Sequence, residues 1–240
     1  MGVVEVVDRS DMINEMKAML QIDPKKTAIV TIDMHRGHLD PKVATMPLTP
    51  EDRGRVIRHT SILLNIGRGH GIPVVHVVVV VRRIPGLGKE TLILPFYQHL
   101  QKIQDMRRRL IPGGKMAIED HNIEGSVGTE IIPELYKEGD YVIKNKKRLD
   151  SFYGTDLEIL LSALRVDTAV FTGVNTNTCV LNTCFTAAHK GFKVIVISDC
   201  VASMYGQDLH VFALQNIQRC FGWVLTVGEF EQKVKLAERA

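Results

Sequence analysis

The chain has 240 residues, of which 45% are hydrophobic and 24% are charged, and its 30 basic and 27 acidic residues leave a formal net charge of +3. This balance is typical of a globular protein and excludes a disordered chain. No block of five like charges accompanies the small net charge, so we expect neither nucleic-acid binding nor membrane binding. The longest apolar run, residues 73–81, is about half as long as the ~20 residues that a membrane-spanning helix needs.

The compartment is inferred from the cysteines and the N-terminus. Acidic residues stand where the basic region of a secretory signal peptide would be, and four cysteines lie in the second half of a chain too long to be a small disulfide scaffold. We therefore expect a cytoplasmic protein with reduced cysteines.

Hydrophobic periodicity and capping residues predict helices and strands that alternate along the chain. In chain order they are a helix at 11–20, a strand at 27–32, a helix at 50–69, strands at 74–81 and 141–143 with a short helix at 131–135 between them, a helix at 155–165, a strand at 168–172, a helix at 178–190, a strand at 193–197, a helix at 207–218 and a strand at 223–227. Six strands alternating with helices indicate one α/β domain over residues 1–240, with a Rossmann-like, doubly wound, mostly parallel six-stranded sheet.

Two segments fall outside this alternation. Residues 1–24 form an N-terminal extension. Residues 82–126 are less regular, with a helical stretch around 93–109. A connection of this length usually carries function, so we expect a lid or an oligomer contact there.

Several common motifs are missing from the sequence. There is no G-x-x-x-x-G-K-[ST] phosphate loop, no G-x-G-x-x-G after the first strand, no G-x-S-x-G nucleophile elbow and no C-x-x-C pair. Nucleotide binding, a serine hydrolase and a structural zinc site are therefore disfavoured.

Three reactive side chains stand at the ends of predicted strands: Asp33, Lys146 and Cys179. Cys179 would lie in the first turn of a helix, where unpaired N–H groups lower a thiol pKa and can bind an oxyanion. Taken alone, each residue has a structural explanation, since most cysteines are small buried hydrophobic residues. Their joint occurrence at the strand ends of one sheet favours a catalytic site.

At these residues the chain resembles the isochorismatase-like cysteine hydrolases. The resemblance rests on AIVTIDM at residues 28–34, KKRLDSFYGTDL at 146–157 and TGVNTNTCV at 172–180, in the order that the family has them. It implies an Asp-Lys-Cys triad of Asp33, Lys146 and Cys179. Lys144 and Lys147 are rivals for the lysine, but the spacing to the following FYGT favours Lys146.

The resemblance also implies further features of the site. It implies a cis peptide bond between Val174 and Asn175 and an oxyanion hole made of the N–H groups of Thr178 and Cys179. The acid would take the thiol proton, the lysine would stabilise the thiolate, and the cysteine would attack a carbonyl to give a thioester. No cofactor is expected, and a homo-oligomer, a tetramer or a dimer, is implied.

The family contains several activities. Members that cleave a vinyl ether do not need the cysteine, so Cys179 favours hydrolysis of a carbon–nitrogen bond. NIQRCFGWV at residues 216–224 resembles ureidoacrylate amidohydrolases, and DSFYGTDLE at 150–158 resembles biuret and N-carbamoylsarcosine hydrolases. We therefore expect a small ureido or carbamoyl compound or a linear amide as substrate. A lactam hydrolase, a vinyl ether hydrolase and a non-catalytic binding protein on the same fold remain alternatives.

No metal site is expected. Nicotinamidases of this family hold a metal with an Asp and several His after the second strand, but here Arg82 and Arg83 follow that strand. His35 and His38 form an H-x-x-H after Asp33, yet isolated histidines are mostly satisfied by hydrogen bonds.

The remaining candidates concern the substrate. His35 replaces the glutamine that usually follows Asp-Met in the family and could contact substrate. Arg82, Arg83 or Arg148 could bind a substrate carboxylate, and Phe152 and Tyr153 could wall the pocket. The other cysteines are interpreted as core residues: Cys184, Cys200 and Cys220.

Overall fold

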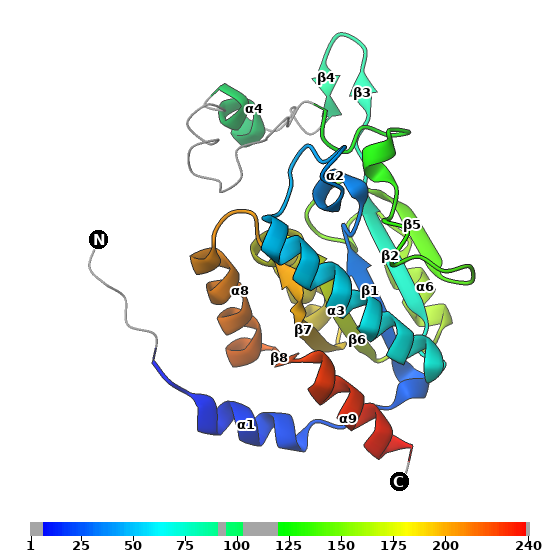
Figure 1. Ribbon diagram of the computed structural model, residues 1–240, viewed down its shortest axis with the longest axis vertical. Coiled ribbons are helices and arrows are strands. Elements are labelled where there is room, and N and C mark those ends of the chain that lie inside the picture. The colour runs from blue at the N-terminus through cyan, green and yellow to red at the C-terminus, as the bar shows by residue number, and fades with distance from the viewer. Residues whose placement is uncertain (1–6, 91–94, 103–119, 239–240) are drawn as a thin grey trace.

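The computed structural model describes residues 7–90, 95–102 and 120–238. Its main feature is a six-stranded sheet in the order β5-β2-β1-β6-β7-β8, in which every neighbouring pair is parallel (Figure 1). The strands are β1 (Thr27–Ile32), β2 (Val74–Val79), β5 (Tyr141–Lys146), β6 (Thr168–Val174), β7 (Lys193–Ala202) and β8 (Gly222–Leu225). The predicted α/β, Rossmann-like, six-stranded fold is confirmed, and its sheet is parallel throughout.

Helices cover both faces of the sheet (Figure 1). The helices described are α1 (Ser10–Met19), α2 (Arg36–Leu39), α3 (Pro50–Gly69), α4 (Pro95–Lys102), α6 (Leu157–Ala163), α7 (Leu181–His189), α8 (Gln207–Cys220) and α9 (Val227–Ala237), and α4 lies apart from the sheet (Figure 1). Apolar residues of α3 and α9 belong to one buried core, and those of α6, α7 and α8 belong to a second core. The central strands β1 and β6 are buried along their whole length, which explains their continuous apolar, β-branched sequences.

Two elements differ from the prediction. Residues 131–135 form a turn instead of a helix, with Ile131 in an isolated bridge to His35. Pro133 lacks an N–H and disfavours the helical conformation of the residue before it, which opposes a helix over this segment. The last strand ends at Leu225, because Thr226 and Glu229 form a capping box that begins the unpredicted helix α9.

The segment after β2 begins with a small antiparallel hairpin of β3 (Arg83–Ile84) and β4 (Gly88–Lys89). The helical stretch predicted at 93–109 appears as α4 at residues 95–102, while 91–94 and 103–119 lie outside the described residues. Part of the predicted lid or oligomer contact at 82–126 therefore also lies outside them.

The N-terminal extension packs against the end of the chain. Helix α1 lies beside α9 (Figure 1), and the Lys17 ammonium is 2.9 Å from the Glu229 carboxylate. The indole N–H of Trp223 donates to the Met16 carbonyl at 3.1 Å. Across the described ranges, none of the helices has the length and apolar composition to cross a membrane.

Candidate active site

The structure brings Asp33, Lys146 and Cys179 together at the carboxyl ends of the strands. Lys146 Nζ lies 2.5 Å from Asp33 Oδ2, and both side chains are completely buried. The other carboxylate oxygen of Asp33 accepts the N–H of Val79 at 2.7 Å, which holds the acid in place. Cys179 lies close enough to both charged groups for each to shift the pKa of its thiol. Lys146 rather than exposed Lys144 or half-buried Lys147 contacts the acid, because β5 continues past residue 143.

A glycine allows this close approach. Gly173 pairs with Ile32 across β1 and β6 and has a φ of +125°. A Cβ at this position would lie 2.0 Å from the Ile32 carbonyl oxygen, so no other residue fits without moving a strand. The end of β6, and with it the turn that carries Cys179, is thereby held against the end of β1.

The structure overturns one expectation about Cys179. The residue lies in a π-helical turn, Thr176–Val180, that precedes α7, and its thiol is buried. Burial raises the pKa of the thiol to about 12; the Asp33 charge adds to this shift and the Lys146 cation opposes it. The prediction that the helix start lowers this pKa was wrong, because the loss of hydration outweighs the favourable local charges. The thiol is protonated near neutral pH.

Lys146 keeps its charge in the same environment. Burial by itself would lower the pKa of this lysine, but the Asp33 charge and the hydrogen bonds with Asp33 and Cys179 outweigh it, and the pKa is raised. The pair therefore consists of a buried cation and a buried carboxylate next to a neutral thiol.

The backbone around Cys179 has a cis peptide bond between Val174 and Asn175. Of the two N–H groups assigned to the oxyanion hole, that of Thr178 donates to the Asn175 carbonyl at 3.1 Å. An oxyanion would therefore have to displace or share this contact.

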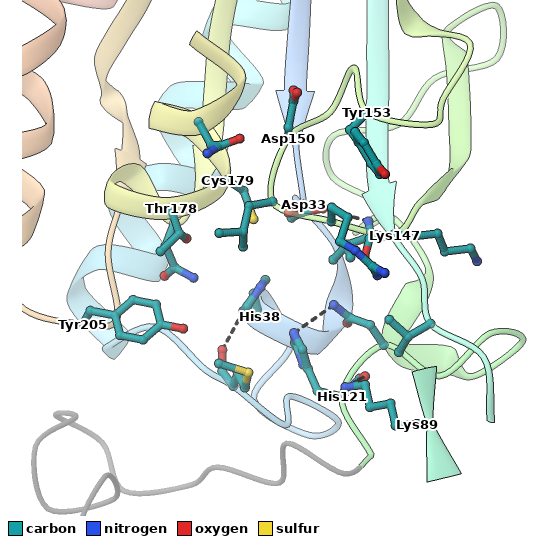
Figure 2. A pocket seen from close by; sticks show the side chains of 18 residues that line it. Asp33, His38, Lys89, His121, Lys147, Asp150, Tyr153, Thr178, Cys179 and Tyr205 are labelled. Atoms are coloured by element: carbon teal, nitrogen blue, oxygen red, sulfur yellow. Dashed lines mark hydrogen bonds between the residues drawn. The ribbon is translucent and has the colours of Figure 1, made fainter. Parts of the chain in front are cut away.

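A cavity of about 490 Å³ opens beside Cys179 (Figure 2), within the size range of small-molecule sites. Tyr153 and Arg148 line it, as the sequence suggested. The other suggested contacts, His35, Phe152 and Arg82, are not among its lining residues. The lining residues are Asp33, His38, Met46, Val79, Val81, Lys89, His121, Asn122, Lys147, Arg148, Leu149, Asp150, Tyr153, Asn175, Thr178, Cys179, Asn182 and Tyr205.

The predicted substrate contacts that do not line the cavity interact with other parts of the protein. Phe152 is buried in the core, with its ring stacked 6.0 Å from that of Phe192. Arg82 is mostly exposed and pairs with Glu90, and Arg83 pairs with Asp120 at the surface.

The three cysteines predicted to be core residues differ in burial. Cys184 and Cys200 are buried, but Cys220 is exposed at the end of α8, so its assignment to the core was wrong.

Three basic side chains are among those that line the cavity. Lys147 and Arg148 follow β5, and Lys89 reaches the cavity from β4. Lys89 Nζ donates to the His121 carbonyl at 2.6 Å, and burial lowers the pKa of this lysine to about 8. Sequence reasoning missed Lys89, His121 and Asn122, because no local pattern shows that these loops fold over the strand ends.

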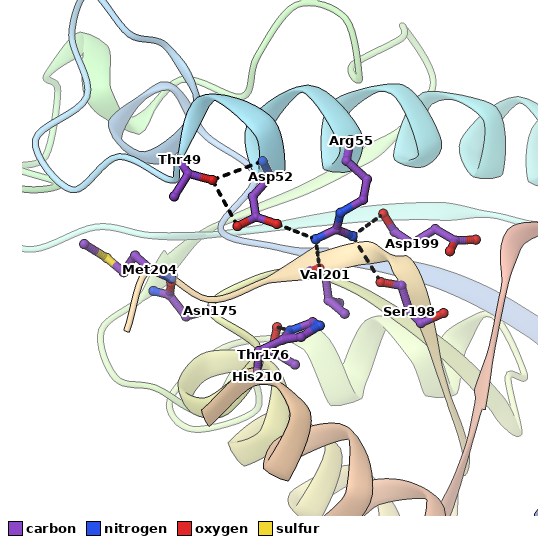
Figure 3. Close-up of polar contacts among 10 residues, drawn as sticks. All are labelled: Thr49, Asp52, Arg55, Asn175, Thr176, Ser198, Asp199, Val201, Met204 and His210. Atoms are coloured by element: carbon purple, nitrogen blue, oxygen red, sulfur yellow. Dashed lines mark hydrogen bonds and ion pairs between the residues drawn. The ribbon is translucent and has the colours of Figure 1, made fainter. Parts of the chain in front are cut away.

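A second layer of polar contacts, also missed, supports the turn that carries Cys179 (Figure 3). Arg55 on α3 donates to the Asp199 carbonyl at 3.0 Å and to the Val201 carbonyl at 3.2 Å, and it pairs with Asp52 at 2.8 Å. These contacts hold the carboxyl-terminal half of β7 in place. From the loop beyond it, the N–H of Met204 donates to Asn175 Oδ1 at 2.9 Å.

Three histidines gather at the edge of the cavity: His35, His38 and His121. One ring nitrogen of each lies within 4.8 Å of the others, and all three side chains are buried. The ligand set expected of nicotinamidases, an Asp and His after the second strand, does not fit this chain, because β2 runs into Arg82 and Arg83. Of the three histidines, His35 and His38 follow β1, and only His121 lies in the long connection between β2 and β5.

A cavity at the carboxyl ends of a doubly wound sheet defines an α/β protein with a small-molecule site. The chain belongs to the isochorismatase family, since the isochorismatase domain matches residues 27–229. The resemblance found in the sequence is thereby confirmed.

Comparison with known proteins identifies relatives of similar length. Ureidoacrylate amidohydrolase RutB of Methylobacterium radiotolerans is 27% identical over 229 residues, which cover 92% of this chain and 84% of the relative. A cysteine hydrolase from Pseudomonas syringae pv. phaseolicola superposes with a TM-score of 0.72 at 22% identity, covering 91% of this chain and 96% of that one. N-carbamoylsarcosine amidase from Thermoplasma acidophilum gives 0.61 at 24% identity, covering 84% and 96%. At these identities the two structures show the shared fold.

Proposed function

We propose that the protein is a cysteine-dependent amidohydrolase that cleaves a carbon–nitrogen bond of a small ureido or carbamoyl compound or linear amide. The observation that carries this proposal is the buried Asp33–Lys146 ion pair beside Cys179 at the wall of the cavity. Burying two charges costs free energy that their attraction often fails to repay, so such a pair is weak evidence for a stabilising role. A pair of this kind next to a nucleophile and an open cavity is better explained by catalysis.

The raised pKa of the thiol specifies how the nucleophile acts. A resting thiolate is disfavoured, so Cys179 loses its proton to Asp33 as its sulfur attacks the substrate carbonyl. Both carboxylate oxygens of Asp33 already accept one hydrogen bond, but each has a second lone pair that can take the proton. Lys146 remains a cation and stabilises the negative charge that develops on sulfur and on the carbonyl oxygen.

The remaining steps return the enzyme to its starting state. The tetrahedral intermediate, with its oxyanion against the N–H groups of Thr178 and Cys179, breaks its C–N bond as Asp33 returns the proton to the departing amine or ammonia. Asp33 then takes a proton from water, whose oxygen attacks the thioester. Asp33 passes that proton to the Cys179 sulfur as the C–S bond breaks, which releases the product acid and restores the thiol.

The charge around the cavity narrows the substrate class. Arg148 and Lys147 line the cavity, and the Lys147 ammonium also lies 3.9 Å from carboxylate oxygens of Glu90 and Glu124. The Arg148 guanidinium is suited to a substrate carboxylate, which it can bind with two parallel hydrogen bonds. The relative from Methylobacterium radiotolerans is named for a ureido acid. A small ureido or amide compound that also carries a carboxylate therefore fits this cavity best.

The experiment is a hydrolysis assay on a panel of ureido acids, linear amides, lactams and a vinyl ether, with wild type, Cys179→Ala and Cys220→Ala. Ammonia or amine release from ureido acids that is lost in C179A and kept in C220A is the expected result. Ring opening of lactams alone would favour the lactam alternative. Ether cleavage that survives in C179A, or no turnover of any compound, would overturn the proposal.

A direct test of the thioester is to quench wild-type protein in acid during turnover of a good substrate and to record intact-protein mass spectra. A mass increase equal to the acyl group, mapped to Cys179 and absent in C179A, is the expected result. An adduct on any other residue would contradict the assignment of the nucleophile.

A further inference from the structure

Three imidazole rings meet at the cavity edge although they come from distant parts of the chain. His35 caps the start of α2 and His38 lies within this helix, just after β1, while His121 lies in the segment before β5. The ring centroids of His38 lie 4.7 Å from those of His35 and of His121. Within the described ranges, no hydrogen bond joins any two of these rings, so hydrogen bonding between them does not explain the cluster.

The hydrogen bonds of His38 leave a lone pair available. Its Nδ1 lies 2.7 Å from the Met46 carbonyl oxygen, which can only accept, so Nδ1 carries the proton and Nε2 is unprotonated. A backbone carbonyl on one ring nitrogen is the arrangement that orients a metal-binding histidine and fixes its tautomer.

His35 is completely buried, and neither of its ring nitrogens has a hydrogen bond of normal geometry in the described structure. Burial lowers the pKa of this ring, and the nearby backbone of Gly128 opposes the shift only in part. A buried polar atom without a partner loses its hydration without compensation and calls for an explanation. The side-chain oxygen of Asn122, next to His121, also lacks a partner among the described residues. Asn122 Oδ1 and His35 Nδ1 both lie close to Gly37, where an added Cβ would come within 2.8 Å of the first atom and 3.0 Å of the second.

Each ring nitrogen of His121 has one side-chain hydrogen-bond partner, and one of these hydrogen bonds would break when the ring binds an ion. Its Nδ1 lies 2.7 Å from Thr45 Oγ1, and its Nε2 lies 2.8 Å from the amide nitrogen of Asn122. Both partners are side chains that can rotate. Burial lowers the pKa of all three histidines, so near neutral pH they are uncharged and offer lone pairs.

The geometry points to a metal site: we propose that His35, His38 and His121 together bind one divalent transition-metal ion, such as Zn²⁺ or Co²⁺. Three neutral imidazoles are a ligand set suited to these ions, and a three-histidine site leaves a fourth position open. His38 and His121 line the cavity across from Cys179 (Figure 2), so the open position faces the substrate space. At His38 the buried Asp33 carboxylate offsets part of the repulsion from Lys146, while at His121 both Lys89 and Lys146 oppose a positive charge.

The test is titration of chelator-treated protein with Co²⁺ near pH 7.5, followed by the visible absorption of the ion. We expect one equivalent to bind with the intense bands of a four-coordinate site and to raise the thermal unfolding midpoint. His121→Ala and His38→Ala should each weaken Co²⁺ binding by at least about 10-fold, since loss of even an outer-shell partner weakens metal binding 10- to 100-fold. His189→Ala removes an exposed histidine of α7 and should bind Co²⁺ as wild type does.

The wild-type titration decides the proposal without any variant, so a variant that fails to fold does not prevent the test. Absence of a four-coordinate spectrum in wild-type protein, or equal loss of binding in H189A and H121A, would overturn it. At the fully buried position 35, the variant is His35→Gln, because glutamine has a side chain of similar length and alanine would leave a larger cavity. The readout is binding and absorption, so it stands whether or not the amidohydrolase proposal holds.

Discussion

Lys146 Nζ and Asp33 Oδ2 are 2.5 Å apart in a part of the molecule where neither side chain touches solvent. The two residues lie 113 positions apart in the chain and on strands separated by β2. The contact depends on β1 and β5 ending at the same edge of the sheet. It therefore links the stability of this edge to the proposed chemistry.

Removing one member of the Asp33–Lys146 pair should lower both the stability of the protein and its turnover. Lys146→Met leaves the Asp33 carboxylate buried without its cation, and we expect a loss of about 3–5 kcal/mol in unfolding free energy together with loss of turnover. Asp33→Leu combined with Lys146→Met should restore most of the stability but no activity. Urea unfolding and product release measure the two effects, with Lys144→Met on the exposed face of β5 as the matched control. An active double variant would contradict the assigned roles.

Cys179 should react slowly with iodoacetamide in the free protein. Its pKa is raised to about 12 by burial, so the thiolate fraction near neutral pH is very small and grows as the pH rises toward that value. Exposed Cys220 should be modified first. Peptide mass spectrometry over a pH series measures both rates. Faster modification of Cys179 than of Cys220 near pH 7.5 would show that the thiol is ionised after all.

Gly173→Ala should be far more damaging than Gly191→Ala. Both glycines have positive φ, so each substitution costs about 1–2 kcal/mol in backbone strain. Only at Gly173 would the new Cβ meet backbone, 2.0 Å from the Ile32 carbonyl oxygen, while the space around Gly191 is open. Urea unfolding should show the difference, and equal effects would mean that β1 and β6 separate at little cost.

The histidine cluster should make the metal-free protein sensitive to acid. The pKa values of His35, His38 and His121 are lowered chiefly by burial, so the unfolded chain binds protons more readily than the folded one. Their contribution to stability is complete above about pH 6.5, the ordinary histidine value, and is lost as the pH falls through the lower values of the folded state. His121→Gln should therefore flatten the fall in stability below pH 6.5. Unfolding by urea across this pH range in the presence of a chelator is the measurement, and an unchanged slope would contradict the assignment.

Arg148→Ala should raise KM for substrates that carry a carboxylate by about 10- to 100-fold, the effect of one charged hydrogen-bonding group. Neutral amides should be affected much less, and kcat should change little. Arg82→Ala is the control, because Arg82 does not line the cavity and pairs with Glu90. Equal changes in KM for charged and neutral substrates would indicate that Arg148 shapes the cavity without binding an anion.

The sequence by itself determined what depends on local pattern. Runs of buried, β-branched residues specify strands, capping residues specify helix starts, and their alternation specifies a parallel sheet whose carboxyl ends meet. Asp33, Lys146 and Cys179 each follow or end such a strand, so the strand pattern alone predicts that they lie close together. Even the missed helix α9 had a local signal in Thr226 and Glu229.

Only the tertiary structure decided what depends on contacts between distant segments. His121 and Asn122 reach the cavity because of the path taken by a long connection, and Arg55 supports β7 from another layer of the molecule. The ionisation of Cys179 is of the same kind, because hydration is lost only when several elements close over the thiol, and that loss outweighs the local effect of a helix start. Periodicity encodes which way a side chain faces within its own element, but burial and pKa are sums over neighbours that the fold assembles.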